Sequence, residues 1–371
     1  MKIAFTPEHE EWRQNVRAFV QQKSPDKEVR RLMATDDGFD PEVWSQMAEQ
    51  LGFQGLAVPE EYGGLGFGFV ELGIVFEEMG RALMCAPLLS TAVLAVGALL
   101  ASGDADAKKT YLPSIASGKT IATLAVTEGT GEWDERAIAT KATRRGGEWR
   151  LSGSKTFVPD GHIAKLVLVV ARSDNGISLF AVEAGAPGLS STAMTAMDQT
   201  RKLSELKLDD VPAQLVGAEG AGWNVVTHVL NLAAVAISAE CAGGAQQCLD
   251  MAVSYAKTRK QFGRVIGSFQ AIKHKCADML LEVESTKSAA YYAMWAAGGD
   301  FSELPLCASL AKSYSTEAFF RVAAENIQIH GGIGFTWEHS AHLYFKRAKS
   351  SELLFGTPTF HRELMAQHLN V

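Results

Sequence analysis

Apolar and polar positions along the chain follow two different periods. Between residues 1 and 118, apolar side chains recur at helical spacing, as in FVELGIVFEEMGRAL (69–83). From about 120 to 215 the segments become short, β-branched and alternating, and turns are supplied by Gly146-Gly147 and Asn175-Gly176. The pattern therefore predicts a helical region followed by a small antiparallel β domain.

Helical periodicity returns from Gly222 onward, in segments that are more apolar than before. Residues 223–260 predict one helix of about 40 residues, which is longer than the usual helix of a globular protein. Further helices are predicted from Ser268 and over 305–330. Such long apolar helices need cover on several faces, which a helical bundle packed against other subunits would provide. The chain therefore divides into three predicted domains, at 1–118, 119–220 and 221–371.

Composition and charge argue against several classes of protein. The chain has 371 residues, 47% of them hydrophobic, which suffices for two or three domains with a large core. Its net charge of −7 argues against nucleic-acid binding. The first twelve residues, MKIAFTPEHEEW, contain acidic residues where a signal peptide would have an apolar core, so we predict no signal peptide. The apolar stretch VLNLAAVAISA (229–239) is too short for a membrane span. These features predict a cytoplasmic protein.

Cysteine and histidine spacing predicts neither disulfides nor a metal site. The five cysteines form no C-x-x-C pair, and Cys241 and Cys248 would lie about 10 Å apart along one helix, too far to bridge. We therefore predict free thiols in a reducing compartment. His339 and His342 form H-x-x-H, but no third ligand lies at a recognisable spacing, so we predict no metal there.

Two stretches carry a more specific signal. They are YAKTRKQFGRVIGSFQAIKHKCADM (255–279) and ENIQIHGGIGFTWEHSAHLYFKRAK (325–349). Each alone is typical of a helix end with cations or glycines. Together, in this order and on an α–β–α layout, they closely resemble the flavin-dependent acyl-CoA dehydrogenases over essentially the whole chain.

The resemblance implies both a fold and a chemistry. The implied fold is α+β but mostly α, with an N-terminal helical domain, a middle antiparallel β-barrel and a C-terminal four-helix bundle, assembled as a tetramer. In this family a glutamate removes a proton from Cα of an acyl-CoA thioester while a hydride leaves Cβ for FAD. The electrons then pass to an electron-transfer flavoprotein. The resemblance therefore implies an oxidoreductase of lipid metabolism.

The catalytic glutamate is missing from both positions at which the family places it. It most often precedes a Gly-Thr step, as in Y-E-G-T, and the matching segment here is LLFGT (353–357), with Phe355 at that position. A minority of the family carries it on the long helix after the barrel, where this chain has Ala233. Glu240 lies seven residues further along and is the remaining candidate base, the alternative being a polar residue at a helix or subunit contact.

The flavin contacts implied by the resemblance are matched unevenly. The family's T-E-P-x-A-G-S-D is TEGTGEWD (127–134) here, and its W-I-T is FVP (157–159), so Pro159 offers no hydroxyl and no N–H. On this chain's own side, Thr127, Phe157 and Thr357 remain as candidate FAD contacts. The residues that the family lends to the ADP half of a neighbour's FAD are all present: Arg259, Gln261, Phe262, Gln328, Gly331 and Gly332.

This uneven match predicts a subunit without its own catalytic base, beside a glutamate-bearing partner. Some actinobacterial members that act on steroid side-chain thioesters are α2β2 heterotetramers. The stretches IGSFQAIKHKCADM and GGIGFTWEH closely resemble the sequences of those members. Two alternatives stay open. One is a self-sufficient flavoenzyme, such as an active homotetramer, that uses Glu240 or needs no glutamate. The other is a non-enzymatic acyl-CoA binder or scaffold that has lost flavin.

Overall fold

The computed structural model describes residues 4–299 and 301–371, and the chain divides into two compact units. The helical unit contains Met1–Arg30, Phe69–Met84 and Ala234–Val371, and the barrel unit contains Arg31–Gly68 and Cys85–Ala233. Two helices, α2 (Asp26–Met33) and α7 (Gly222–Thr258), belong in part to each unit. Both units are therefore built from separate parts of the sequence.

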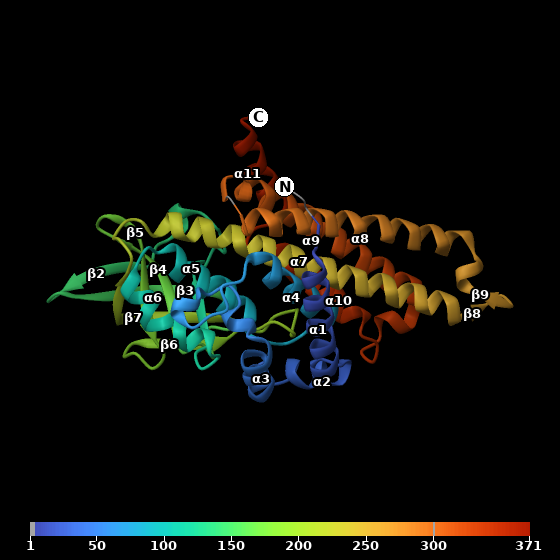
Figure 1. The fold of residues 1–371 in the computed structure, drawn as a ribbon, viewed down its shortest axis with the longest axis horizontal. Helices are drawn as coiled ribbons and strands as arrows, with labels where there is room; N and C mark the ends of the chain where they lie inside the picture. Colours follow the sequence, from blue (N-terminus) through green and yellow to red (C-terminus); the bar gives the residue numbers. More distant parts are fainter. Residues whose placement is uncertain (1–3, 300) are drawn as a thin grey trace. The chain divides into compact units, whose positions relative to one another are not determined.

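The helical unit consists of long helices with short connections. Besides most of α7 it holds α1 (Pro7–Lys23), α4 (Phe69–Arg81), α8 (Gln270–Ala297), α9 (Leu304–His330), α10 (Ala341–Leu353), α11 (Pro358–Leu369), β8 (Lys260–Gln261), β9 (Arg264–Val265), η5 (Ile266–Ser268), η6 (Phe301–Glu303) and η7 (Gly331–Phe335). Within this unit α7, α8 and α9 run side by side (Figure 1). The three long helices predicted from the sequence are confirmed, with 37, 28 and 27 residues.

Small residues let α7 approach its neighbours closely. A Cβ added at Gly243 would lie 1.8 Å from the backbone O of Glu77 on α4, and one at Gly244 would lie 2.5 Å from the Phe319 ring on α9. A larger side chain at either position would force the helices apart. Among the described residues, α7 alone is long and apolar enough to cross a membrane, but 72% of its most apolar window is buried, as expected for a core helix.

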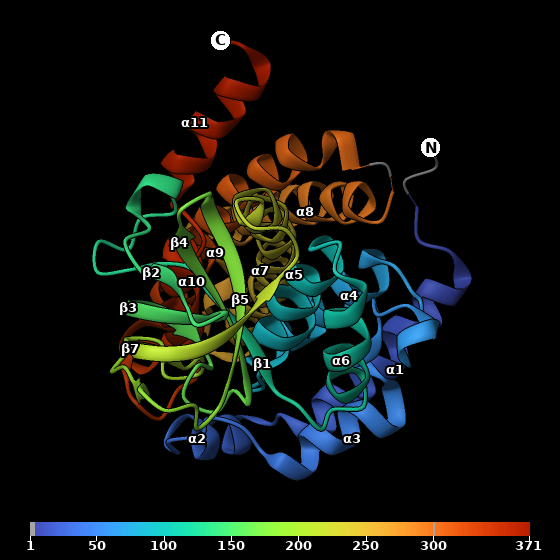
Figure 2. The ribbon, with the colours of Figure 1, turned by 90° about the vertical axis from the view of Figure 1, so that its left-hand side faces the viewer.

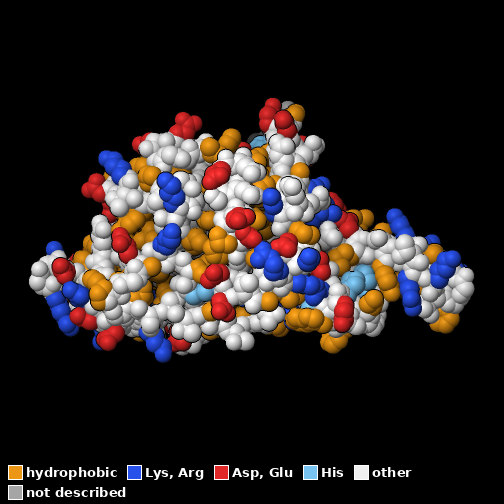
Figure 3. Space-filling view, turned by 90° about the horizontal axis from the view of Figure 1, so that it is seen from below, with side chains coloured by type: hydrophobic (Ala, Val, Ile, Leu, Met, Phe, Trp, Pro, Cys, Tyr) orange, Lys and Arg blue, Asp and Glu red, His pale blue; other side chains and the backbone are white. Residues whose placement is uncertain are grey.

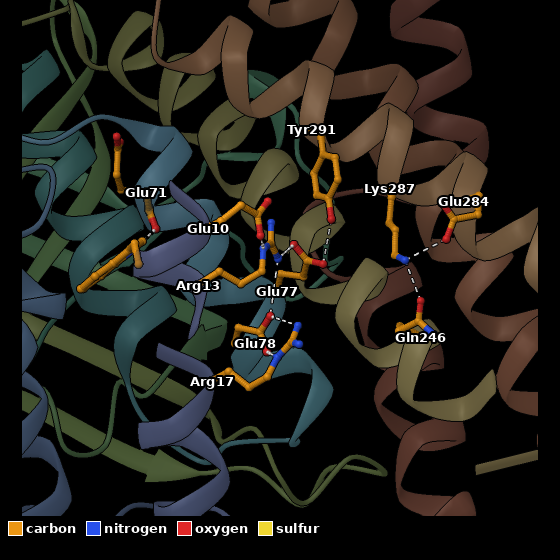
Figure 4. Close-up of polar contacts among 11 residues, drawn as sticks. Glu10, Arg13, Arg17, Glu71, Glu77, Glu78, Gln246, Glu284, Lys287 and Tyr291 are labelled. Carbon is orange, nitrogen blue, oxygen red and sulfur yellow. Dashed lines mark hydrogen bonds and ion pairs between the residues drawn. The ribbon is translucent and has the colours of Figure 1, made fainter. Parts of the chain in front are cut away.

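A buried polar cluster fixes α1 to α4 and α8 (Figure 4). Arg13 Nη1 donates to Glu77 Oε2 at 2.5 Å, and Arg17 Nε donates to Glu78 Oε2 at 2.8 Å. Tyr291 on α8 donates its hydroxyl to Glu77 Oε1 at 2.9 Å. Arg13, Glu77 and Glu78 are buried, and charge-assisted bonds between such partners are strong, so the N-terminal helix is an integral part of the helical unit.

The barrel unit contains a closed sheet (Figure 2). Its strands are β1 (Ala122–Ala125), β2 (Lys141–Arg145), β3 (Glu148–Pro159), β4 (Leu166–Ser173), β5 (Gly176–Glu183), β6 (Leu189–Ala193) and β7 (Leu203–Val216). Neighbours pair in the order β4-β2-β3-β7-β5, and β5 pairs back with β4 to close the ring. Most pairings are antiparallel, as predicted, but β1 runs parallel to β4 and β2 makes one parallel pair with β4.

The barrel unit also contains helices and short helical turns. They are α3 (Pro41–Leu51), α5 (Val96–Ala101), α6 (Ala105–Ala116), the 3-10 turns η1 (Phe53–Gly55), η2 (Glu60–Tyr62) and η4 (Glu135–Ala137), and the π-helix η3 (Leu89–Ala95). Inside the barrel, Leu151, Val169 and Phe180 are fully buried, as are Leu206 and Val211. The apolar residues of the alternating pattern therefore point into the barrel, as the sequence predicts.

The mostly helical α+β fold class is confirmed, with a helical N-terminal part, a barrel-like sheet and a helical C-terminal part. All five cysteines are free thiols, and four of them are buried. Within the described part of the chain, no group of three or more His, Cys, Asp or Glu side chains could hold a metal ion.

Candidate functional site

LLFGT forms a tight turn between α10 and α11. Phe355, at the position that the resemblance gives to the catalytic glutamate, has φ +61° and is 2% exposed. Gly356 follows with φ +103°, and Thr357 caps α11 by accepting the N–H of Phe360 at 3.3 Å. A phenylalanine in the left-handed region costs about 1–2 kcal/mol, so other contacts must hold the turn in this shape.

Two buried side chains hold the carbonyls of this turn. His361 Nε2 donates to the O of Phe355 at 3.0 Å, and His361 Nδ1 lies 3.4 Å from Ser309 Oγ. Lys312, which is fully buried, donates from Nζ to the O of Gly356 at 2.9 Å. Burial, reinforced by the charge of Lys312, lowers the pKa of His361 to about 3, so the ring is neutral at pH 7. The turn therefore has a fixed backbone, although the side chain of Phe355 cannot accept a proton.

Glu240, the remaining candidate base, forms a buried ion pair. Its carboxylate pairs with Arg347 on α10, and the two side chains are 5% and 4% exposed. A Cβ added at Gly80 on α4 would lie 2.1 Å from the backbone O of Glu240, so α4 and α7 are in direct contact there. Ala233, the other family position for the base, is fully buried. These contacts favour a structural role for Glu240, and its role as a base stays a prediction.

Thr127 and Phe157 lie together at one edge of the barrel. Thr127 Oγ1 donates to the O of Thr156 at 2.6 Å, and the Thr156 N–H donates to the O of Thr127 at 2.9 Å. The Thr127 hydroxyl therefore already donates its proton within the barrel, and toward a ligand its oxygen could serve only as a hydrogen-bond acceptor. Phe157, by contrast, is 39% exposed and has φ +55°, an unusual backbone conformation for a bulky residue.

The R-K-x-F-G stretch forms a small hairpin at the end of α7. Strands β8 and β9 pair through Lys260↔Val265 and Gln261↔Arg264, and Phe262 and Gly263 turn between them with φ +52° and +79°. Phe262 is 91% exposed at the tip. The hairpin and the last turn of α7 carry exposed cations and no acid: Lys257, Arg259, Lys260 and Arg264. Figure 3 shows Lys and Arg side chains gathered at this end of the molecule.

The Q-x-x-G-G stretch forms the junction between α9 and η7. Gln328 is exposed on the last turn of α9, and Gly331 follows with φ +65°. A Cβ added at Gly331 or Gly332 would meet no heavy atom within 4 Å, so the backbone here is open to close approach. Tyr255, near the end of α7, stacks on His330 with ring centroids 4.4 Å apart, which joins the base of the hairpin to the start of η7.

Apart from Glu240, which lies in its buried ion pair with Arg347, the predicted site residues form three groups. The first group consists of Arg259, Gln261, Phe262, Gln328, Gly331 and Gly332 in the helical unit. We call it the lending surface, because the resemblance implies that these residues contact the FAD of a neighbouring subunit. The second is the LLFGT turn with Phe355 and Thr357, in the same unit. The third is the barrel edge with Thr127 and Phe157, in the other unit.

Sequence reasoning missed three buried polar residues. Lys312 and His361 hold the LLFGT turn, and Lys155 donates from Nζ to the O of Val126 at 2.9 Å at the barrel edge. Lys312 and Lys155 are fully buried. Because lysine is typically a surface residue, nothing in the sequence predicted that these two side chains would be buried. His361 follows LLFGT by four residues, and that proximity was the one available signal.

Family models describe nearly the whole chain. The model for the N-terminal domain of acyl-CoA dehydrogenases matches residues 6–119, the model for the middle domain matches 123–211, and the model for the C-terminal domain matches 220–370. The acyl-CoA dehydrogenase IpdE2 of Mycobacterium tuberculosis is 34% identical over 346 residues, which are 93% of this chain and 92% of that protein.

Two similar solved structures are named after pairs of proteins. The ChsE4-ChsE5 complex from Mycobacterium tuberculosis has a chain that matches with a TM-score of 0.90 and 29% identity, over 100% of this chain and 99% of that one. A variant of the Tcur3481-Tcur3483 steroid acyl-CoA dehydrogenase matches with a TM-score of 0.88 and 30% identity, over 98% of both chains.

Proposed function

The chain belongs to the acyl-CoA dehydrogenase family, and on this premise we propose that it is a subunit without its own catalytic base, working beside a glutamate-bearing partner. The reaction of the assembly is the α,β-dehydrogenation of an acyl-CoA thioester. In this assembly the chain lends contacts to a flavin and the partner supplies the proton acceptor.

The observation that carries the proposal is the residue at 355. A phenyl ring has no lone pair for a proton, and Phe355 is buried in a turn whose carbonyls are fixed by His361 and Lys312. Neither other position compensates, because Ala233 is apolar and Glu240 is paired with Arg347. Positioned proton transfer typically contributes ~10²–10⁴-fold to an enzymatic rate, so this chain alone should turn over very slowly.

The lending surface fits the ADP half of FAD, the cofactor of this family. A guanidinium such as that of Arg259 binds the oxygens of a diphosphate, and the exposed cations around it add to the attraction. The open backbone at Gly331 and Gly332 allows a phosphate or ribose to approach closely. When bound, FAD supplies the acceptor for the hydride that leaves the acyl chain.

The relatives support the mixed assembly and suggest its substrate. The ChsE4-ChsE5 complex and the Tcur3481-Tcur3483 enzyme each join two different chains, and the latter is described as a steroid acyl-CoA dehydrogenase. We therefore propose a heterotetramer that acts on a steroid-derived acyl-CoA in the cytoplasm and passes electrons to an electron-transfer flavoprotein.

The test is to assay the purified chain with medium-chain, branched and steroidal acyl-CoAs and an artificial electron acceptor, alone and after adding the glutamate-bearing partner. We expect turnover only with the partner. Strong turnover by the chain alone, lost in Glu240→Gln, would make Glu240 the base and refute the proposal. A chain that carries no flavin alone or with any partner would instead indicate a non-enzymatic scaffold.

A further inference from the structure

The segment that joins α9 to α10 closes on the end of α9 through two histidine rings. His330 is the last residue of α9, and the centroid of its ring lies 4.4 Å from that of His339. The backbone is in close contact at the same place, because a Cβ added at Gly334 would lie 2.8 Å from Cβ of His330. Gly331 and Gly332 of the lending surface begin this segment, so their position depends on how the segment is held.

His339 is held in its neutral form. Its Nδ1 accepts the N–H of Ala341, the first residue of α10, at 3.1 Å. An imidazole nitrogen that accepts a hydrogen bond carries no proton, so the single ring proton is on Nε2. A proton added to Nδ1 would remove the bond to Ala341 and place a positive charge at the N-terminus of α10, where the helix dipole disfavours it.

The surroundings of His339 also disfavour a positive charge. Burial is the largest cause that lowers the pKa of His339, followed by the charge that His330 would carry. His342 and Arg30 lower this pKa further, whereas Asp26 opposes the shift. Arg30 lies in the same place because its Nη1 donates to the O of Trp337 at 2.7 Å. The charged and titratable groups that face the two rings are Asp26 and Arg30 from α2, Arg81 from α4, Asp250 and Tyr255 from α7, and His342 from α10.

His330 accommodates a proton better than His339 does. Its Nδ1 donates to the O of Asn326 at 2.8 Å, and protonation keeps this bond. The ring lies at the C-terminus of α9, where the helix dipole favours a cation, and it stacks on Tyr255, whose ring face attracts one. Burial still lowers the pKa of His330, so this ring is also neutral at pH 7. The ring that loses a contact on protonation is therefore His339.

We propose that His339 makes the lending surface sensitive to pH. In its neutral form it holds the segment 331–340 against the end of α9, and the backbone of Gly331 and Gly332 stays in place for a diphosphate. In its protonated form it loses the bond to Ala341 and repels a protonated His330, so the segment leaves α9 and FAD binding weakens. The inference rests on the proposed function and adds to it a release of the lent contacts by acid.

FAD binding should therefore be strongest near neutral pH and fall on acidification. The closed segment keeps the pKa of His339 below its ordinary value of 6.5, so opening the segment takes up a proton below that pH. One proton changes an equilibrium constant by up to about tenfold per pH unit, and the dissociation constant for FAD should rise by up to that factor. His361 does not contribute, because with a pKa of about 3 it stays neutral in the folded chain over this range.

The experiment measures two quantities at pH 7, 6 and 5. The dissociation constant for FAD of the full chain with its partner reports the lending surface, and the amide protection factors of residues 331–341 in the chain alone report the segment. His339→Asn keeps an acceptor for the Ala341 N–H but cannot be protonated, so both quantities should become nearly independent of pH. His339→Lys carries a charge at every pH, so at pH 7 its dissociation constant should be about tenfold or more above that of wild type.

The matched control is His368→Gln, which alters an exposed histidine on α11 and should keep the pH dependence of wild type. Equal pH dependence in wild type and His339→Asn would overturn the inference, and so would FAD affinity that falls with acid while the protection factors stay constant. Should His339→Lys fail to fold, His339→Asn decides by the same two quantities. A wild type that holds no FAD with any partner at pH 7 would refute the proposed function, whereas the protection factors would still show whether His339 controls the segment.

Discussion

The lending surface and the LLFGT turn belong to the same helical unit but match the acyl-CoA dehydrogenase family in opposite ways. On the lending surface the side chains match and stand exposed, as Arg259 and Phe262 do at the hairpin. In the LLFGT turn the side chain that would do chemistry is replaced by Phe355, while a strained backbone conformation is still held by His361 and Lys312. One region keeps the exposed side chains through which we propose that the chain contacts a flavin, and the other keeps its backbone shape but has Phe355 at the position of the family's glutamate.

This difference teaches that a backbone scaffold and the chemistry it carries are separable. The carbonyls of Phe355 and Gly356 are bound by buried donors that do not depend on the identity of the side chain at 355. A substitution there removes the proton acceptor without dismantling the turn. We therefore expect a chain that folds and assembles like its family but depends on a partner for the proton transfer.

The largest expected effect concerns the partner's base. In the mixed assembly, replacing the partner's catalytic glutamate by glutamine should lower turnover by ~10²–10⁴-fold, because no carboxylate of this chain replaces it. Steady-state assays of the reconstituted assembly measure this. Glu148→Gln in this chain is the matched control and should leave turnover unchanged. If the partner variant stayed fully active, the base would have to come from this chain, which would contradict the claim that this chain lacks one.

Glu240→Gln should destabilise the chain without affecting the chemistry. Removing one member of a buried ion pair takes this carboxylate away from the buried Arg347, and breaking such a pair typically costs about 3–5 kcal/mol in the free energy of unfolding. Urea denaturation measures the loss, and turnover per folded assembly should match wild type. The double variant Glu240→Leu with Arg347→Leu should recover most of the stability. A Glu240→Gln protein with normal stability and no turnover would identify Glu240 as a base.

His361 should make the fold sensitive to acid. Its pKa is about 3 in the folded chain and near 6.5 when unfolded, so unfolding takes up a proton between these values. Stability from this group is therefore complete above about pH 6.5 and falls by about 1.4 kcal/mol per pH unit as the pH drops toward 3. Urea denaturation at pH 6.5, 5.5 and 4.5 measures the slope. His361→Gln should reduce it and His368→Gln, an exposed position on the same helix, should not; equal slopes in all three proteins would show that the turn is not held as described.

Periodicity predicted the elements of the fold well. The long helices α7, α8 and α9 and the strands β4 and β5 lie where spacing and turn residues place them, because many residues contribute to each pattern. The parallel pairing of β1 with β4 was not predictable, since pairing partners depend on tertiary closure of the sheet. The division of α7 between two compact units has no local signal either.

For the candidate site, the sequence identified positions but not their supports. The resemblance to the family gave Arg259, Gln328 and Phe355, because each lies in a stretch that matches a family motif. The buried lysines Lys155 and Lys312 and the Glu240–Arg347 pair were not predictable. Burial of a charge depends on partners that come from distant parts of the chain, and local composition does not record them.

The most direct test of the central claim is the flavin affinity of the mixed assembly when only this chain is altered at the lending surface. Arg259→Ala should weaken FAD binding roughly ten- to hundredfold, as the loss of a charge-assisted contact of ~1.5–3 kcal/mol predicts. Lys260→Ala, the adjacent exposed cation on the same hairpin, is the matched control and should have a much smaller effect. Flavin fluorescence on dilution of the assembly measures both. Full flavin occupancy in Arg259→Ala at dilutions that release FAD from wild type would contradict the claim that this chain lends its contacts to a flavin.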